Sequence, residues 1–361
     1  RDRSPSRGLG DVYKRQFIDH DGDGNLYIRA RGTDEDMYID AKDNLNLQTN
    51  STTRVEIDSD GVVSIAPGDT YPIDISVGLT ASAISFGIGS GCLTANTGTN
   101  NLALGYHALD LCTTSGWNTA LGHYTLGSLT AQSGAPAYAQ YSTAVGFEAL
   151  YSNTTGSGGN VALGFRAGKG TTTGVNNIWI GMQCGSAGAT TGSANTAVGY
   201  NAFQNSTTAI GDVCVGAYAG QNTTEALNLV AVGYLAGVNV TTGDDNIAIG
   251  TQALYTNTTS DDNTAIGFQS LFYATNINNV GLGSYAGHWI TSGHSNTMIG
   301  YYAGSGYPTT GDNNTVIGYA AQPVAAGTDN SVTLGNSSIT ALRCQVTSIT
   351  AISDERDKTD I

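Results

Sequence analysis

Charged side chains are scarce in this chain. Only 12% of the 361 residues are charged, and 14 Lys and Arg residues face 29 Asp and Glu residues. No stretch gathers Lys and Arg into the basic stripe that phosphate groups need, so the sequence excludes nucleic acid as a partner. Long apolar runs are missing as well. None approaches the roughly 18 residues of a membrane-spanning helix, so no membrane insertion is expected.

Cysteine and histidine are also few, with five residues of each. The cysteines form an odd set without a Cys-x-x-Cys pair or a His at metal-ligand spacing, so neither a zinc site nor a disulfide framework is indicated. The histidines are scattered, and no Ser-His-Asp order or nucleotide-binding loop is present. We therefore expect no metal, no cofactor and no turnover enzyme. The cysteines are Cys92, Cys112, Cys184, Cys214 and Cys344.

Glycine, by contrast, is abundant, with 49 residues against six prolines. This content is too high for a helical protein, and it lacks the every-third-residue spacing of collagen. An apolar content of 40% is too high for a disordered low-complexity chain. The composition therefore favours a repetitive β architecture.

A repeat of about 17 residues, centred on glycine, runs from residue 85 to residue 335. Val, Ile or Leu always precedes the glycine and a small residue always lies three positions after it, so both columns are expected to point inward. Asn usually lies four positions before the glycine, where it can form either a ladder between coils or an Asx-turn. The fifteen repeat glycines are Gly89, Gly105, Gly122, Gly146, Gly164, Gly181, Gly199, Gly216, Gly233, Gly250, Gly267, Gly283, Gly300, Gly318 and Gly335.

The repeat predicts an all-β fold. Seventeen residues are too few for a βαβ unit, and Gly, Thr and Asn disfavour a helix, so two short strands and two turns are expected in each coil. We predict a β-roll or β-helix rod over residues 81–335, with fifteen coils ~4.8 Å apart and a length of roughly 70 Å. Cys92, Cys184 and Cys214 fall in the small inward columns and are expected to be buried.

An aromatic residue directly follows the glycine in eight repeats. Such a column buries area between coils or between neighbouring chains, and we favour this interpretation over the stacking of sugars. The eight residues are Tyr106, Phe147, Phe165, Tyr200, Tyr234, Phe268, Tyr301 and Tyr319.

Residues 17–80 break the period and gain charge. Short alternating strands separated by Asp, Gly and Asn predict a β-rich stalk. Because such a segment buries little by itself, partner chains are expected to complete it. The predicted strands lie at residues 25–30, 36–41, 44–49, 54–58 and 61–66.

One stretch of this stalk imitates the first half of a calcium-binding loop. Asp19, Asp21, Asp23 and Gly24 have the required spacing, but Ala30 stands where the bidentate Glu should be. A plain turn is therefore favoured.

Carboxylates also line up within the repeats. The spacing predicts that Asp244 lies over Asp261 and Asp245 over Asp262, ~5 Å apart in a coil stack. This is near the separation in a retaining glycosidase, and it also suits a weak cation site. The favoured interpretation is simpler, since Asp is a common turn former.

One repeat carries an insertion. The glycines Gly122 and Gly146 are 24 residues apart, and insertions in solenoids leave the coil as surface loops that often carry contacts. We therefore predict that the loop over 135–141 protrudes and contacts a receptor. The candidate residues are Ala135, Pro136, Tyr138 and Tyr141.

The first 16 residues resemble the translated sequencing-adaptor remnants found at the edges of assembled environmental DNA. They are excluded from the fold prediction as an artefact. The expectation is that the true N-terminus, with its attachment to other proteins, is missing.

The Asn-Thr-Ala-Ile-Gly repeats resemble the β-roll heads of trimeric adhesins and, more closely, repeats of bacteriophage tail fibres. The last 31 residues resemble the junction before the self-cleaving intramolecular chaperone of endosialidase-type tail fibres. That chaperone begins with a Ser-Asp-x-Arg-x-Lys-x-Asp-Ile phrase, which would follow a junction over 336–352. The matching residues here are Ser353, Asp354, Arg356, Lys358, Asp360 and Ile361.

The second resemblance implies autoproteolysis at the Ile352–Ser353 bond. In the family, the Ser attacks the carbonyl before it and the Lys assists, which assigns these roles to Ser353 and Lys358. A Lys accepts the proton only if partial burial lowers its pKa. Asp357 occupies a position that is often apolar in the family, so the environment of Lys358 is open. A solvated charged tail is the alternative for residues 353–361.

Together the resemblances imply a homotrimeric segment of a phage tail fibre or tailspike, located in the virion and assembled in the host cytoplasm. Its partners would be its own copies, other tail proteins and a glycan or protein receptor on the host cell surface. The alternatives are the head of a bacterial trimeric autotransporter adhesin and a polysaccharide-degrading tailspike.

Overall fold

The structure is a computed structural model. It describes strands at 16–20, 26–30, 45–49, 52–57, 63–65 and 73–80, and then residues 83–93, 98–112, 115–128, 141–154, 158–307, 309–341 and 343. Side chains are described from residue 85 onwards. Within these ranges the fold is all-β, as the composition predicts, and it contains no helix.

The strands before residue 89 are antiparallel. β1 (Gln16–His20) pairs with β2 (Leu26–Ala30), and a second sheet begins with β3 (Leu45–Thr49), β4 (Thr52–Ile57), β5 (Val63–Ile65), β6 (Ile73–Thr80) and β7 (Ala83–Ile88), each paired with the next. Four of the five predicted strands are therefore confirmed; the one at 36–41 lies outside the described residues. Asp19 lies on β1 opposite Tyr27, and residues 21–25 of the calcium-like stretch are also outside the described residues.

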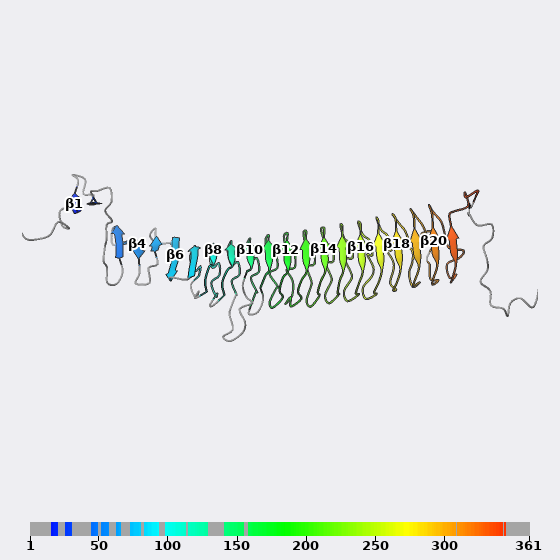
Figure 1. The fold of residues 1–361 in the computed structure, drawn as a ribbon, viewed down its shortest axis with the longest axis horizontal. Helices are drawn as coiled ribbons and strands as arrows, with labels where there is room; N and C mark the ends of the chain where they lie inside the picture. The colour runs from blue at the N-terminus through cyan, green and yellow to red at the C-terminus, as the bar shows by residue number, and fades with distance from the viewer. Residues whose placement is uncertain are drawn as a thin grey trace, which may run out of the picture.

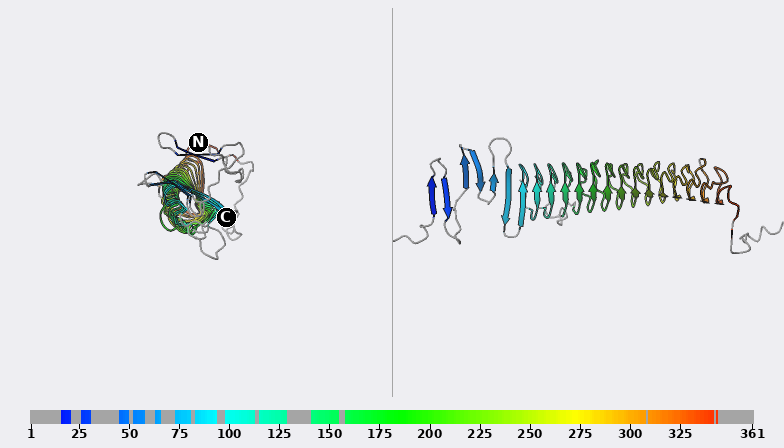
Figure 2. Two further views of the ribbon diagram at one scale, coloured as in Figure 1. Left: turned by 90° about the vertical axis from the view of Figure 1, so that its left-hand side faces the viewer. Right: turned by 90° about the horizontal axis from the view of Figure 1, so that it is seen from above.

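The sheet becomes parallel at β7, which pairs with β8 (Leu102–Leu104). From there a parallel β-solenoid of about 13 coils, spaced about 17 residues apart, forms an elongated rod (Figures 1 and 2). Each strand is hydrogen-bonded to the next in sequence without a register shift. The strands after β8 are β9 (Thr119–Leu121), β10 (Thr143–Val145), β11 (Val161–Leu163), β12 (Ile178–Ile180), β13 (Thr196–Val198), β14 (Val213–Val215), β15 (Val230–Val232), β16 (Ile247–Ile249), β17 (Thr264–Ile266), β18 (Val280–Leu282), β19 (Thr297–Ile299), β20 (Thr315–Ile317) and β21 (Val332–Leu334).

Each coil contains one three-residue strand, so the prediction of two strands per coil is wrong. The return passage is a ribbon of turns whose backbone enters the left-handed region twice, for example at Gln252 (φ 56°) and Leu254 (φ 53°). In this conformation alternate backbone N–H groups point in opposite directions along the rod. Gln252 N–H donates to the carbonyl of Tyr234 in the preceding coil, and Leu254 N–H donates to that of Ser270 in the following coil. The passage is therefore hydrogen-bonded to both neighbours without being a regular strand.

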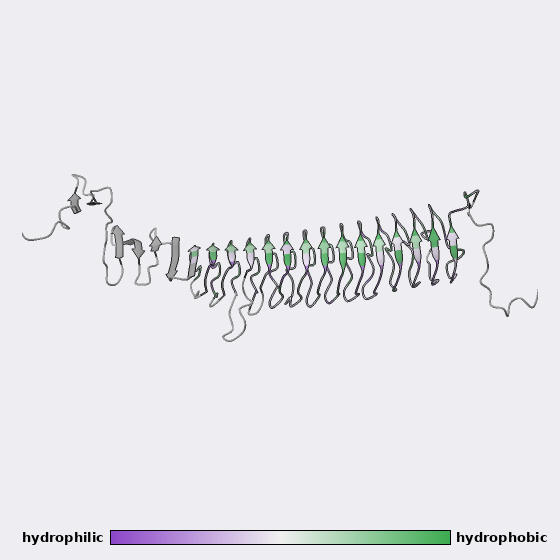
Figure 3. Ribbon diagram, viewed as in Figure 1, coloured by the Kyte–Doolittle hydropathy of each residue, from purple (hydrophilic) through white to green (hydrophobic). Residues whose placement is uncertain are grey.

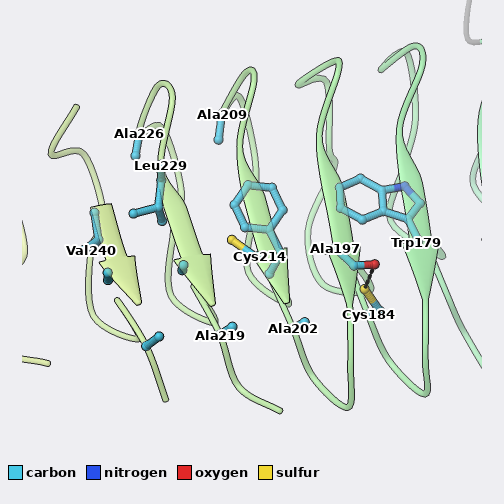
Figure 4. Close-up of a cluster of buried hydrophobic side chains, with 14 of the residues drawn as sticks. Trp179, Cys184, Ala197, Ala202, Ala209, Cys214, Ala219, Ala226, Leu229 and Val240 are labelled. Atoms are coloured by element: carbon cyan, nitrogen blue, oxygen red, sulfur yellow. Dashed lines mark hydrogen bonds between the residues drawn. The ribbon is translucent and has the colours of Figure 1, made fainter. Parts of the chain in front are cut away.

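The core lies between the strand and the return passage. The small residue three positions after the glycine is buried in all described coils except at Ser338, as predicted, whereas the Val, Ile or Leu before the glycine is not. That part of the prediction is wrong because a three-residue strand alternates, and only its middle residue points inward. The middle residue is Ala in most coils, and Figure 4 shows how such small side chains fill the narrow interior. Cys92, Cys184 and Cys214 are buried as expected.

Large and small core residues compensate for one another between coils. In the coils of β8 to β19 the residue four positions after the glycine is either a buried Leu or Phe, or a Gly. Where it is Gly, a larger side chain occupies the space: Trp179 lies against Gly168 and Gly185, and Met298 against Gly287 and Gly304. The interior therefore stays filled although single positions vary in size.

The repeat glycines stack directly on one another. Their φ angles lie between 127° and 143° in all coils except the last, a region that L-residues avoid. A Cβ added at Gly250 would come within 2.5 Å of the carbonyl oxygen of Gly267 in the next coil. Close approach of the backbones thus requires glycine, which is why the column has no exception.

Asn side chains form a ladder between coils, which decides between the two interpretations left open by the sequence. Asn195 is typical: its Oδ1 accepts the N–H of Asp212 at 3.0 Å, and its Nδ2 donates to the carbonyl of Ala209 at 2.8 Å. Both partners lie in the next coil. The amide satisfies buried backbone groups that a narrow, dry interior would otherwise leave unpaired.

Candidate functional site

The outer surface of the parallel sheet is apolar and free of formal charge. We define the sheet face as the first and third residues of each strand from β8 to β21 and Phe86 and Ile88 of β7, together with the residue after each repeat glycine. None of these residues is Asp, Glu, Lys or Arg. Leu163 is 49% exposed and Phe165 is 42% exposed, and most of the exposed large hydrophobic side chains of the described residues belong to this face. Figure 3 shows the strands as a green, hydrophobic band along the rod.

The predicted aromatic column belongs to the sheet face. Its rings touch between neighbouring coils in places: Phe147 stacks on Phe165 with centroids 5.6 Å apart, and Tyr301 stacks on Tyr319 at the same distance. All eight remain exposed to a substantial extent, with Tyr319 at 68%. Contact between coils therefore covers only part of each ring.

The opposite surface varies along the rod. We define the return face as the fifth and sixth residues after each repeat glycine, with the side chains that contact them. In the coils of β10 and β11, Glu148 Oε2 accepts hydrogen bonds from Arg166 Nε at 2.8 Å and Lys169 Nζ at 2.6 Å. In the coils of β13 to β15 the same columns carry amides, where Asn222 accepts from Asn205 Nδ2 at 2.9 Å and donates to Asn239 Oδ1 at 3.1 Å.

Aromatic rings replace these polar groups in the coils of β16 to β18. Tyr255 stacks on Phe272 with centroids 4.8 Å apart, and Tyr273 stacks on Trp289 with centroids 4.6 Å apart. Tyr285 joins these rings to the edge of the sheet face through Tyr302, at 4.5 Å. We call this set the aromatic belt. It consists of Tyr255, Phe272, Tyr273, Tyr285, His288, Trp289 and Tyr302.

His288 is the member of the belt whose pKa is lowered. Its Nδ1 lies 3.1 Å from the carbonyl oxygen of Gln269, which fixes Nδ1 as the donor and leaves Nε2 as an acceptor. Burial lowers the pKa of His288 below its usual value, and the bond to Gln269 offsets this only in part. The imidazole is therefore neutral at pH 7.

The belt is absent from the sequence-based expectations. The aromatic column directly after the glycine, which includes Phe268, Tyr301 and Tyr319, was predicted. The rings five and six positions after the glycine were not predicted. A signal was available, because Tyr255, Phe272–Tyr273 and His288–Trp289 share the same columns in three consecutive repeats.

The predicted receptor loop is described only at its end. Ala135, Pro136 and Tyr138 lie outside the described residues. Tyr141 is 63% exposed and stacks on Trp117 of the preceding coil, with centroids 5.5 Å apart. This leaves an accessible aromatic pair beside the insertion.

The stacked aspartates hold the backbone of turns. Asp244 Oδ1 accepts the N–H of Leu227 at 2.8 Å, and Asp261 Oδ1 accepts the N–H of Asp244 at 2.9 Å. Asp245 and Asp262 occupy left-handed positions with φ of 55° and 58°, which Asp and Asn tolerate better than most residues. These contacts account for the aspartates as turn formers.

Asp212 is a buried carboxylate in the Asn ladder. Its Oδ1 accepts the N–H of Leu229 at 2.6 Å, while its Oδ2 has no hydrogen-bond partner among the described residues. Burial raises the pKa of Asp212 to about 7, although the bond from Leu229 lowers it somewhat. In the next coil Leu229 stands where the ladder would have Asn. Within the described ranges Asp212 therefore has one oxygen without a hydrogen bond, and its carboxyl group can titrate.

The described cysteines are unsuited to reactive chemistry. Burial raises the pKa of Cys112 to about 11 and that of Cys184 to about 12, so both stay protonated thiols at neutral pH. Cys344, the cleavage residues Ile352 and Ser353, and Lys358 lie outside the described residues. Within the described ranges, no group of three His, Cys, Asp or Glu residues has a geometry that could hold a metal ion.

The described part of the chain also contains no helix that is long and apolar enough to cross a membrane. Comparisons of the chain with protein-family models, curated proteins and solved structures found no match. Any proposal on function therefore rests on the fold. This fold is a parallel β-solenoid with a uniform sheet face and a variable return face.

Proposed function

We propose that the chain is a structural and adhesive segment of a phage tail fibre or tailspike that mediates attachment to a host surface. In this proposal three copies assemble side by side through their sheet faces. The uncharged, apolar sheet face carries the proposal, because a surface of this length is unusual on a protein that stays monomeric.

The dimensions of the sheet face suit a second copy of the same chain. Fourteen steps of ~4.8 Å and a width of four residues at ~3.3 Å give roughly 890 Å² on each copy, which a trimer would divide between two neighbours. A standard stable interface covers roughly 800 Å² on each partner. Because every coil presents the same columns, copies in register would pair like columns along the whole rod. The cyclic arrangement closes the assembly, and a closed assembly leaves no sheet face free for further growth.

Assembly is tested by mass measurement in solution with light scattering. The unmodified chain is expected to be a trimer, and Ile249→Lys, which buries a charge in the sheet face, is expected to reduce the mass to that of a monomer. The matched control is Gln221→Lys on the return face, which should leave the trimer intact. A stable, well-folded monomer of the unmodified chain would overturn the proposal.

We further propose that Ser353 releases a C-terminal folding chaperone by single-turnover autoproteolysis. The support is the ordered phrase over 353–361, where Ser353 would attack the Ile352 carbonyl and Lys358 would take the proton. A removable template is physically reasonable, since identical repeats pair out of register at little cost.

The cleavage experiment fuses the chaperone domain of an endosialidase-type tail fibre in frame at Ser353. The folded fusion should produce a new C-terminus at Ile352, and Ser353→Ala should leave it intact. Mass spectrometry reads out both products. Cleavage that persists in the Ala variant would remove Ser353 as the nucleophile.

A further inference from the structure

The aromatic belt is not required by the scaffold. The same two columns carry Gln204 and Asn205 in one coil and Gln221 and Asn222 in the next, and those coils have the same strand and turn geometry. The rings at these positions are therefore a local feature of the coils of β16 to β18, which the scaffold does not require. Leaving Trp289 38% exposed and Tyr302 36% exposed to water has a free-energy cost that folding alone does not explain.

The ring of Trp289 is partly exposed to solvent. One face stacks on Tyr273, so the other is directed towards the following coil. The residue in the same column of that coil is Gly306, which has no side chain to cover the indole. The backbone N–H of Gly306 is engaged by Gln322 Oε1 at 2.7 Å, which holds this turn in place beside the ring. The row of rings thus ends in a flat apolar surface at one coil.

Neutral hydrogen-bonding groups lie in the same coils as the rings. Gln269 Nε2 donates to Gln252 Oε1 at 2.7 Å, which orders both amides at the edge of the belt. His288 offers Nε2 as an acceptor. Formal charge is sparse: between Tyr255 and Tyr302 only Asp261 and Asp262 carry it, and neither Lys nor Arg is present. An anionic ligand would therefore find no cation here.

We propose that an uncharged glycan binds along the aromatic belt, with the apolar face of a sugar ring against the face of Trp289 opposite Tyr273. Its hydroxyl groups pair with the Gln252 and Gln269 amides and with His288 Nε2. A sugar ring combines an apolar face with a polar rim, which matches rings edged by neutral donors and acceptors. The inference deepens the proposed attachment function and rests on it, since it names the ligand class and the coils that meet it.

The locality of the belt argues for a glycan over a further copy of this chain. Contacts between identical copies of a repetitive rod repeat along its length, as the sheet face does, whereas the belt is confined to a few coils. A binding site for a ligand is expected to be local in this way.

The test uses the full chain and a panel of uncharged polysaccharides, namely dextran, a mannan and a galactan, with heparin as the anionic comparison. Calorimetry should detect binding to at least one neutral polymer and none to heparin. Trp289→Ala and Tyr273→Ala should each weaken that binding at least tenfold. The control Asn222→Ala lies in the same column as Trp289 but outside the belt, and it should bind like the unmodified chain.

Acrylamide quenching gives a second readout. The chain has three Trp residues, and Trp179 is fully buried, so Trp117→Phe leaves Trp289 as the accessible fluorophore. The glycan should reduce quenching in that background. Binding to heparin alone, no neutral polymer bound, or equal binding by Trp289→Ala would overturn the inference. A drop in assembly mass in Trp289→Ala would also overturn it, because it would assign the belt to contacts between copies.

Failure of the inference can be separated from failure of the proposed function. Labelled rods are applied to a panel of bacterial cells. If the unmodified rod and Trp289→Ala bind cells equally, the attachment function stands and the belt is the wrong site. If neither binds any cell while the polysaccharide result holds, the belt stands as a glycan site and the attachment function fails.

Discussion

The sheet face and the return face are built by the same coils, yet they follow different rules. Along the sheet face every coil carries Val, Ile, Leu, Thr or an aromatic residue and never a formal charge. Along the return face the residues change from an ion cluster around Glu148 to amides around Asn222 and then to the rings around Trp289. A face with the same residues in every coil suits pairing with identical copies of the chain. A face whose residues change along the rod suits recognition of a ligand that is not repetitive. The backbone of the return passage keeps the same hydrogen-bonding pattern from coil to coil, so the variation along the return face lies in its side chains.

The largest expected effect tests whether the two faces share one scaffold. Gly250→Ala places a Cβ 2.5 Å from the Gly267 carbonyl oxygen at φ 131°, so the coils on both sides must move. We expect a loss of at least about 3 kcal/mol of unfolding free energy. The control Gly327→Ala meets no atom closer than 3.6 Å and should be nearly neutral. Chemical denaturation measures both. Similar stability of the two variants would show that the glycine column does not set the spacing of the faces.

The next effect concerns the ladder beneath the sheet face. Because the folded pKa of Asp212 is raised to about 7 and its unfolded value is near 4, its contribution to stability is fully present below pH ~4 and is lost as the pH rises through 7. Asp212→Asn should remove this loss, since its Nδ2 can donate to the Ala226 carbonyl as Asn195 does to Ala209. At pH 8 we expect stabilisation on the order of 2 to 4 kcal/mol, falling towards zero near pH 4.

Thermal unfolding of Asp212→Asn and the unmodified chain across pH 4 to 8 measures this prediction. Parallel pH profiles for the two proteins would mean that Asp212 titrates normally and that the ladder tolerates its charge.

The smallest expected effects on the free energy of unfolding come from two Asn side chains. One lies beneath the sheet face, and the other lies on the return face. Asn263 is fully buried, and its Oδ1 accepts the Asn279 N–H at 3.0 Å; Asn263→Ala should cost roughly 1–3 kcal/mol because that N–H is left unpaired. Asn222 lies in a partly exposed row, where water can replace its partners, so Asn222→Ala should cost less than about 0.5 kcal/mol. Urea denaturation measures both variants. Equal costs would show that burial under the sheet face adds nothing to an amide contact.

Much of the scaffold was predictable, because a strict column in a repeat reflects a contact that every coil must make. The repeat glycines and the small residues three positions later were correctly predicted to be structural. The error at the Val, Ile and Leu column has a physical cause. An apolar residue that recurs in one column of every repeat indicates that its side chain is covered. The sequence alone does not show whether it faces the coil interior or the outside of the sheet. The candidate site was predicted only in part, since the belt joins residues from different columns of the repeat.

The sequence by itself determined the period, the all-β class and the need for glycine at one position per coil, because these depend on spacing and on the backbone approach that a side chain forbids. Only the tertiary structure decided which columns face inward. It placed Ala265 of β17 in the core and Ile266, its neighbour, outside, because one residue along a strand reverses the direction of the side chain. It also decided which rings meet: Tyr273 and Trp289 are 16 positions apart in the chain, and the stacking of coils brings their centroids within 4.6 Å.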